Sequence, residues 1–271
     1  MLRFTKAHAY GNDFLYVRQT AVAGARLDAL ARELCDRHSG IGADGLIVFE
    51  PTAEGASMRL FNADGSRAEV SGNGVRALGA ILMRDGAAPR EHVNIQTEAG
   101  TKKVSRVGGA TADGTRTDYR TEMGLPRDLR QTRLHAGGES VELVVMDFGN
   151  PQAVLLGALP DRERFTRLGG ALERHEAFPA GTNVEFAHVE GPQTVRILIW
   201  ERGVGPTFSS GTGSCAALIA AAAFGEASRD AQIIAPGGTQ RVEWRDDSVY
   251  LTGWAEILFD GEWQRPIVWL T

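Results

Sequence analysis

The chain has little cysteine: Cys35 and Cys215 are the only two among its 271 residues. Two cysteines cannot build a disulfide framework, and their spacing does not match a pair of metal ligands. We therefore expect neither a disulfide scaffold nor a metal site. The same composition fits a protein of the reducing cytoplasm.

Clusters of basic charge and long apolar runs are also missing. Lysine and arginine are scattered and the net charge is −5, so electrostatics gives no reason to expect nucleic acid or an acidic membrane as a partner. The most apolar run, residues 215–224, is too short to span a bilayer. The N-terminal residues alternate like a strand and lack the apolar core of a signal peptide. We expect a cytoplasmic protein with no membrane partner.

The chain also lacks cofactor motifs. Gly72 and Gly74 are not part of the longer Gly-x-Gly-x-x-Gly pattern that binds dinucleotides. Pyridoxal phosphate is not expected either, because Lys6 lies outside the inferred site and Lys102 and Lys103 lie on a predicted hairpin. We therefore predict a protein that works without a cofactor.

What is present is a pattern of short strands and few helices that recurs in the second half of the chain. Each half contains one very apolar helix that follows a Ser-Gly-x-Gly turn, the first beginning at Ser71 and the second at Ser210. A helix of that kind must be buried on nearly every side, so each half is expected to wrap a sheet around it. The polar stretch 108–122 breaks the apolar pattern and is the predicted domain junction. The predicted strands are 3–7, 14–18, 45–50, 57–62, a hairpin over 92–107, 141–148, 152–156, 183–188, 194–202, 230–234, 239–244 and 248–252, with further helices over 27–37 and 161–175.

The two turns have a physical property in common. Two glycines let the backbone bend sharply with no side chain projecting towards a ligand. The first N–H groups of the following helix lack partners and carry partial positive charge, which suits a carboxylate or phosphate. Two such termini could hold one small anionic ligand between them. The simpler interpretation is that Ser71 and Ser210 are N-caps, a position where serine is favoured.

Five ordered segments decide between these interpretations: "KAHAYGNDF" (6–14), "FNADGSRAEVSGNGVRALG" (61–79), "GNPQAV" (149–154), "GTNVEF" (181–186) and "ERGVGPTFSSGTGSCAA" (201–217). In order and spacing they resemble the diaminopimelate epimerase family of cofactor-independent amino-acid epimerases. The resemblance covers essentially the whole chain. It implies an α+β fold of two pseudo-symmetric domains, each a curved, mostly antiparallel sheet wrapped around a central apolar helix, with the active site between them.

The resemblance also implies domain bounds and an assembly. The first domain is expected over 1–115, with a C-terminal segment of about 262–271 returning to it, and the second over 116–261. A homodimer is expected.

Family members use two cysteines, one at the head of each apolar helix, to remove the α-proton from one face and donate a proton from the other. In this chain those positions are Ser71 and Ser210, and Gln152 stands where family sequences usually have a histidine. Cys215 matches a cysteine deeper in the second helix that the family does not use as a base. A hydroxyl is a poor base near neutrality unless another group activates it, so both replacements are expected to weaken a two-base reaction.

The binding positions, by contrast, match the family. The resemblance implies that Glu201 binds the α-amine and helps to orient a base, and that Arg202 pairs with a second carboxylate. His8, in an alternating strand, is more simply a structural residue. The implied catalytic residues are Ser71, Ser210 and Glu201, and the implied substrate contacts are Asn12, Asn62, Gly72, Asn73, Asn150, Asn183, Glu201, Arg202, Gly211 and Thr212.

Three hypotheses follow. The first is an isomerase that converts L,L- to meso-diaminopimelate, a precursor of lysine and peptidoglycan. The second is a divergent enzyme on the same scaffold, which removes a proton from one side of another amino acid and eliminates a β-substituent. The third is a non-catalytic amino-acid-binding protein, or a chain whose cysteines were deliberately replaced by serine. Gln152 favours natural divergence, because replacing thiols gives no reason to change a histidine.

Overall fold

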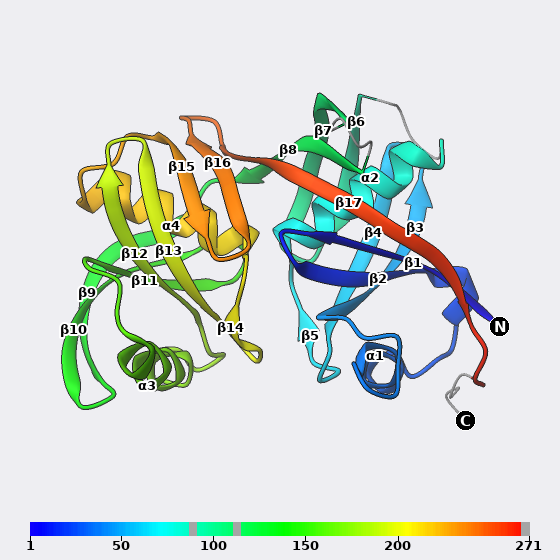
Figure 1. Ribbon diagram of the computed structural model, residues 1–271, viewed down its shortest axis with the longest axis horizontal. Coiled ribbons are helices and arrows are strands. Elements are labelled where there is room, and N and C mark those ends of the chain that lie inside the picture. Colours follow the sequence, from blue (N-terminus) through cyan, green and yellow to red (C-terminus); the bar gives the residue numbers. More distant parts are fainter. Residues whose placement is uncertain (87–90, 111–114, 267–271) are drawn as a thin grey trace. The chain divides into compact units, whose positions relative to one another are not determined.

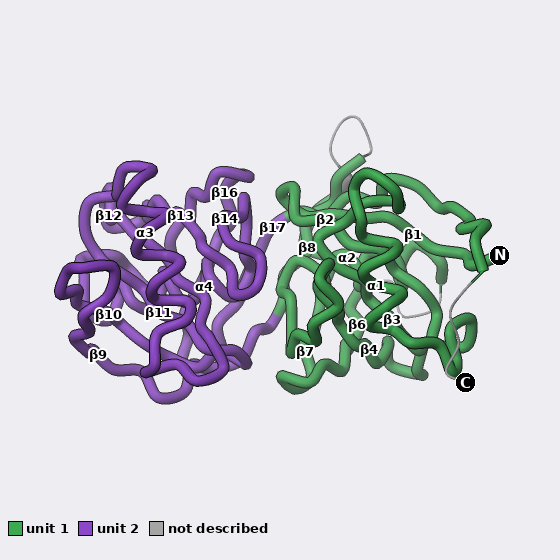
Figure 2. Tube along the Cα trace, turned by 90° about the horizontal axis from the view of Figure 1, so that it is seen from below, with its two compact units in different colours: residues 1–121, 254–271 green, residues 122–253 purple. Residues whose placement is uncertain are grey.

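The computed structural model describes residues 1–86, 91–110 and 115–266, and the chain forms two compact units (Figures 1 and 2). Unit 1 contains residues 1–121 and 254–271, and unit 2 contains residues 122–253. The first boundary, at 121/122, lies later in the chain than the expected 115/116. The second boundary, at 253/254, lies earlier than the expected 261/262. Of the expected returning segment, residues 267–271 lie outside the described part of the chain.

Unit 1 begins with two strands, and its two α-helices are separated by three more. Its elements in chain order are β1 (Leu2–Ala9), β2 (Asn12–Arg18), the 3₁₀ turn η1 (Gln19–Val22), α1 (Leu27–Cys35), β3 (Gly45–Thr52), β4 (Gly55–Asn62), β5 (Arg67–Ala68), α2 (Gly72–Arg84), β6 (His92–Thr97) and β7 (Gly100–Ala110). Two long strands, β8 (Arg116–Gly124) and β17 (Val249–Trp263), carry the chain across the unit boundaries.

Unit 2 repeats this succession of strands and helices. Its elements are β9 (Arg127–Ala136), β10 (Glu139–Asp147), β11 (Pro151–Leu156), α3 (Arg162–Glu173), β12 (Asn183–Gly191), β13 (Thr194–Glu201), β14 (Gly205–Thr207), α4 (Gly211–Phe224), β15 (Asp230–Ala235) and β16 (Gly238–Trp244).

The strand pairings repeat as well. In unit 1 the pairs β1–β2, β3–β4, β4–β5 and β6–β7 are antiparallel, whereas β2–β3 and β4–β6 are parallel. In unit 2 the pairs β10–β11, β12–β13, β13–β14 and β15–β16 are antiparallel, whereas β11–β12 and β13–β15 are parallel. Each strand from β1 to β7 thus has a counterpart from β10 to β16, and α1 and α2 correspond to α3 and α4.

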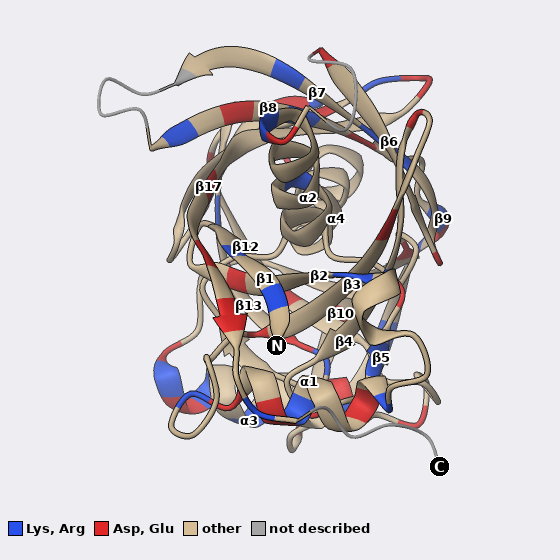
Figure 3. Ribbon diagram, turned by 90° about the vertical axis from the view of Figure 1, so that its right-hand side faces the viewer, with Lys and Arg blue, Asp and Glu red and all other residues tan. Residues whose placement is uncertain are grey.

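Two helices in each unit cover opposite faces of its sheet. In unit 1, α2 contacts β1, β2, β6 and β7, and α1 contacts β3 and β4. In unit 2, α4 contacts β10 to β13, β15 and β16, and α3 contacts β12 and β13. Figure 3 shows charged residues along α1 and α3, whereas α2 and α4 are almost free of them. α4 has no charged residue, and every residue from Gly211 to Ala221 is buried, because strands enclose that helix.

The structure confirms most predicted elements, with two corrections. The stretch 108–122 is not simply a polar break: its described residues belong to the long strands β7 and β8, while 111–114 lie outside the described part. The last predicted strand, 248–252, continues to Trp263 and pairs with β1. The strands β5 and β14, of two and three residues, are too short to give a pattern in the sequence. The strand β9 was not predicted because its residues are mostly polar and exposed.

Candidate functional site

Ser71 and Ser210 sit at the first turns of α2 and α4 in nearly the same geometry. The backbone angles φ and ψ are −127° and 121° at Ser71, and −135° and 130° at Ser210. Each Oγ accepts a hydrogen bond at 3.1 Å from the backbone N–H three residues on, at Gly74 and Gly213. The interpretation as N-caps is therefore confirmed. Capping uses the oxygen as an acceptor, so the hydroxyl proton is left for other chemistry.

The second glycine of each turn is needed for space rather than for an unusual backbone angle. Gly74 and Gly213 lie within their helices and have no positive φ. A Cβ built on Gly74 would stand 2.7 Å from Cδ1 of Ile47, and one built on Gly213 would stand 2.6 Å from Oε1 of Glu185. The expected role of these glycines in a sharp bend is thus corrected: they let the helix approach the sheet closely.

The strand register shows which residues correspond at the two turns. Phe14 pairs with Gly45 in β2–β3, and Gln152 pairs with Asn183 in β11–β12. Gly45 in turn pairs with Asn62, and Val184 pairs with Trp200. Counting from these pairs, the corresponding residues are Asn12 and Asn150, Ile47 and Glu185, Asn62 and Glu201, and Asn73 and Thr212.

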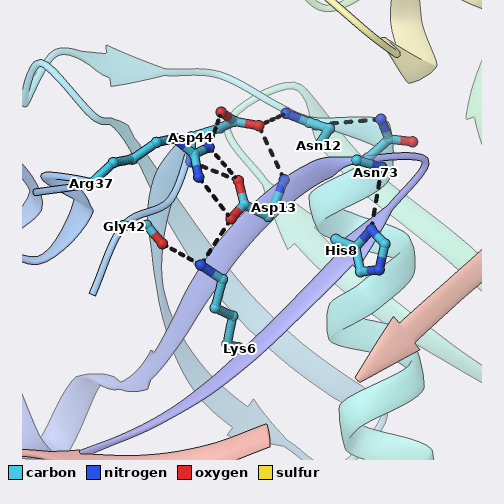
Figure 4. A network of polar contacts seen from close by, with 9 residues as sticks. Lys6, His8, Asn12, Asp13, Arg37, Gly42, Asp44 and Asn73 are labelled. Carbon is cyan, nitrogen blue, oxygen red and sulfur yellow. Dashed lines mark hydrogen bonds and ion pairs between the residues drawn. The ribbon is translucent and has the colours of Figure 1, made fainter. Parts of the chain in front are cut away.

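A polar network supports the turn of unit 1 (Figure 4). The Nδ2 group of Asn73 donates to Oδ1 of Asn12 at 3.3 Å, and Nδ2 of Asn12 donates to Oδ2 of Asp44 at 2.8 Å. The backbone N–H groups of Asp13 and Asp44 complete the link, because each donates to the other residue's carboxylate. The two asparagines predicted to contact substrate are therefore held side by side.

Two cations balance the two carboxylates of this network. Lys6 Nζ lies 2.9 Å from Asp13 and also donates to the Gly42 carbonyl, and Arg37 donates to Asp13 at 2.7 Å and to Asp44 at 2.8 Å. Burial acts to raise the pKa of Asp13, but the hydrogen bonds from Arg37 and Lys6 outweigh it and hold the pKa below the usual value. Burial, followed by the charge of Asp13, raises the pKa of Asp44. Sequence analysis missed all four charged residues; the aspartates next to Asn12 and Gly45 were the available signal.

The other predicted residues of unit 1 lie close to this network. Asn62 ends β4 opposite Gly45 and donates through Nδ2 to Ser66 Oγ at 3.0 Å, in the turn before β5. The Tyr16 hydroxyl donates to the Gly74 carbonyl at 3.0 Å and so fixes the first turn of α2. Gly72 is the first residue of that helix and is buried.

In unit 2 the predicted asparagines bind neighbouring backbone and side chains. Oδ1 of Asn150 accepts from Nε2 of Gln152 at 2.6 Å. Oδ1 of Asn183 accepts from the backbone N–H of Arg202 at 2.9 Å, and its Nδ2 donates to the Pro151 carbonyl at 3.2 Å. Asn183 thereby places the segment that follows Glu201.

The remaining predicted residues of unit 2 lie at the start of α4 and at the end of β13. Oγ1 of Thr212 lies 3.5 Å from the Ser210 Oγ, and Gly211 begins α4. Arg202 donates through Nη1 to the Ala180 carbonyl at 3.1 Å. Glu201 ends β13 and is half-buried. Their contact with a substrate stays a prediction.

Glu185 is the functional candidate that sequence analysis passed over within a quoted motif. It lies between Val184 and Phe186, which face α3, so its side chain points to the opposite face, beneath α4. The residue is 0% exposed, and neither carboxyl oxygen has a hydrogen-bond partner among the described residues. Burial, and then the charge of Glu201, raise its pKa well above the usual value. The sequence did contain a sign of this role, because Glu185 is an acidic residue at an inward-facing position of the predicted strand 183–188.

His8 has the structural role that sequence analysis favoured. Its Nδ1 accepts from the Gly11 N–H at 3.2 Å and its Nε2 lies 3.4 Å from Glu256. Cys215 is completely buried within α4, five residues beyond the cap. Two cavities of about 780 and 810 Å³ both border Arg84, at the end of α2 away from Ser71.

Neither a metal cluster nor a membrane helix stands out in the described part of the chain. Among residues 1–86, 91–110 and 115–266, no group of three or more His, Cys, Asp or Glu side chains is arranged to hold a metal ion. No helix in those ranges is both long and apolar enough to cross a bilayer.

Solved structures define the class of fold. The chain aligns with a predicted epimerase from Pseudomonas aeruginosa at a TM-score of 0.76 and 15% identity, over 98% of this chain and 100% of the other. It aligns with a probable proline racemase from Agrobacterium radiobacter K84 at a TM-score of 0.72 and 15% identity, over 97% and 93%. A phenazine biosynthesis protein of the PhzF family from Bacillus anthracis gives 0.66 and 14%, over 97% and 99%. The mixed α/β fold is thus one shared with racemases and epimerases.

Sequence similarity identifies the family. A family model described as diaminopimelate epimerase matches residues 4–123 and 144–258. The diaminopimelate epimerase of Desulforudis audaxviator is 39% identical, over 97% of this chain and 100% of its own length. Those of Desulfovibrio desulfuricans and Xanthomonas axonopodis are 37% and 38% identical, over 97% of this chain and 98% and 97% of theirs. The chain belongs to the diaminopimelate epimerase family, whose members are cofactor-independent amino-acid epimerases.

Proposed function

We propose that this protein interconverts L,L- and meso-diaminopimelate, with Ser71 and Ser210 at the positions of the two proton-transferring groups. The observation that carries the proposal is the full-length similarity to diaminopimelate epimerases, together with two serine-capped helix N-termini of matching geometry. We further propose a cytoplasmic homodimer.

The chemistry of the proposal uses the two turns in the same way. A reaction that inverts a carbon needs one proton-transferring group for each of its faces, and the proposal assigns one to each turn. The uncapped N–H groups at the two helix N-termini would hold the α-carboxylate and stabilise negative charge that develops next to it. Asn12, Asn73, Asn150 and Thr212 would orient the substrate, and Glu201 would accept from its α-ammonium group.

Serine in place of cysteine changes the demands on the surroundings. An unperturbed thiol has a pKa of about 8.5, which falls further at a helix N-terminus. A hydroxyl is a much weaker acid and needs a neighbouring group to give or take its proton. In unit 2 we propose that Glu201, which ends β13, helps to orient the proton-transferring group.

The pair Glu201 and Arg202 supports a dicarboxylic diamino acid as the substrate class, because it places an anion and a cation next to each other at the end of β13. Asn183 holds that segment through the Arg202 backbone N–H, and the guanidinium group would then pair with the distal carboxylate.

Proton exchange in deuterated water tests the proposal. The protein is incubated with L,L-diaminopimelate in D₂O, and NMR follows the α-proton signal while chiral chromatography follows the stereoisomers. Deuterium at the α-carbon together with the meso isomer is expected. Elimination products instead of the meso isomer, or no α-exchange with either isomer, would overturn the proposal. An Arg202→Ala variant should raise KM more than it lowers kcat.

A further inference from the structure

The sheet face beneath the first turn of α4 carries an excess of hydrogen-bond acceptors. Val154 and Ile199, which pack against α4, lie directly across from Glu185 on β11 and β13. Because alternate residues of a strand share a face, Gln152 and Glu201 point to the same side as these two residues. Neither Oε1 of Gln152 nor the two oxygens of Glu185 has a partner within the described ranges.

An ionised Glu185 would not be stable in this place. Burying a carboxylate without a cation or a hydrogen-bond donor is strongly unfavourable, and the group binds a proton instead. A protonated carboxyl supplies one O–H donor, and Gln152 Oε1 on the same face is an acceptor. The other groups that face Glu185 are Glu201 on β13 and the uncharged first turn of α4, with Ser210 and Thr212. None of them is a cation.

Glu185 and Ser210 border the same turn. A Cβ atom built on Gly213 would lie 2.6 Å from Oε1 of Glu185 and 3.2 Å from Oγ of Ser210. The Gly213 N–H already donates to that Oγ at 3.1 Å. The carboxyl oxygen and the hydroxyl oxygen are therefore within about 6 Å of each other.

We propose that Glu185 holds a proton in the resting protein and is the positioning residue that replaces the proton which Ser210 gives to the substrate. The inference rests on the proposed function. As the Oγ–H bond of Ser210 breaks and a C–H bond forms at the α-carbon, the O–H bond of Glu185 breaks and its proton moves to Oγ. Ser71 enters this step as its alkoxide and becomes a hydroxyl as it takes the α-proton from the opposite face, and Glu185 is left as a carboxylate. The reverse reaction restores both groups.

Unit 1 lacks such a group at the corresponding place, because Ile47 stands there. The two turns thus differ in what lies beneath the serine. The difference also supplies a substitution whose side chain the fold already accommodates at the equivalent site, Glu185→Ile.

The test compares Glu185→Gln, Glu185→Ile and a packing control, Ile47→Val, with the wild type. Infrared difference spectra at pH 7 detect the carbonyl stretch of a protonated carboxyl group, and kinetics in both directions give kcat, KM and the pH profile of kcat.

In the wild type we expect a protonated carboxyl signal that Glu185→Gln removes. In both Glu185 variants kcat should fall about 100-fold or more, with KM within about threefold and melting temperatures near that of the wild type. The pH profile of Glu185→Gln should also lose one ionisation. Ile47→Val should keep the wild-type profile.

The outcomes separate this inference from the proposed function. If the wild type does not convert diaminopimelate, the proposed function fails, and the infrared spectrum still decides the charge of Glu185; an ionised carboxylate at pH 7 would overturn the inference. If the wild type is active and Glu185→Gln keeps its kcat and pH profile, the inference fails and the function stands. If Glu185→Ile does not fold, Glu185→Gln decides alone.

Discussion

Ile47 and Glu185 occupy the same position in the two units, each beneath the second glycine of a serine-capped helix. A Cβ on Gly74 would strike the first, and a Cβ on Gly213 would strike the second. Around them the strand order, the parallel and antiparallel pairings and the cap geometry repeat. The two units differ at this position, where a methyl group of Ile47 is replaced by the carboxyl group of Glu185. Packing does not require the carboxyl group, because isoleucine fills the same place in unit 1.

The pH dependence of stability should reveal the charge of Glu185. Its pKa is raised in the folded protein, whereas in the unfolded chain it is about 4.3. The folded state then binds more protons above that pH, so stability falls as pH rises from about 4.3 to the folded pKa, by up to about 1.4 kcal/mol per pH unit. Glu185→Gln lacks this loss. Urea unfolding of both proteins across this range should show the variant gaining stability relative to the wild type as pH rises. A constant difference would contradict the prediction.

Asp13 should have the opposite effect at acid pH. Its folded pKa is lowered, so its stabilising contribution is present above the unfolded pKa of about 3.9 and is lost as pH falls through the folded pKa. Asp13→Asn leaves the partly buried Lys6 without its carboxylate and should cost about 3 kcal/mol at pH 7. The acid limb of the stability curve should become shallower. Asp28→Asn, at an exposed pair with Arg32, is the matched control and should change the unfolding midpoint little.

Capping and chemistry at the two serines can be separated. Ser71→Ala and Ser210→Ala remove the acceptor for the Gly74 or Gly213 N–H and should each cost about 1 kcal/mol, whereas glycine at either position costs only a few tenths. At a given position alanine and glycine both remove the hydroxyl, so these two substitutions should reduce turnover equally there. Thermal unfolding and turnover are measured on the same four variants. Activity that followed stability would assign the serines to capping alone.

The two turns should not contribute equally to catalysis. Unit 2 has Glu201 at the end of β13 and Glu185 beneath α4, whereas in unit 1 Ile47 stands at the place of Glu185. We expect Glu201→Gln to abolish turnover and Ser71→Ala to reduce it less. Steady-state kinetics in both directions provide the measurement. Equal losses would restore a symmetric two-base site built on hydroxyl groups.

Thiols at both caps should increase activity. The double variant Ser71→Cys with Ser210→Cys places an easily ionised group at each helix N-terminus. Because a general acid or base contributes about 10²–10⁴-fold, epimerisation should rise by at least a hundredfold. The single variant Cys215→Ser should leave the rate unchanged, since that thiol is buried within α4. No gain in the double variant would show that the site has diverged beyond its two bases.

The sequence alone was sufficient for the main elements and for the two serine turns. Apolar periodicity located all four α-helices, because a helix such as α4 with no charged residue must be buried on every side. The order and spacing of five motifs were enough for the family, which the full-length similarity then showed. The capping role of Ser71 and Ser210 also followed from local preference.

Other features depended on contacts between residues far apart in the chain. Lys6, Asp13, Arg37 and Asp44 form one network only because β1, β2 and the segments around α1 and β3 meet. β9 is polar and exposed, and it forms because β10 offers a hydrogen-bonding partner, which no local pattern encodes. Glu185 looked like one more residue of an alternating strand. Only the packing of α4 over Glu185 removes its carboxyl group from water and raises its pKa. Desolvation depends on what packs over a side chain and not on its neighbours in sequence.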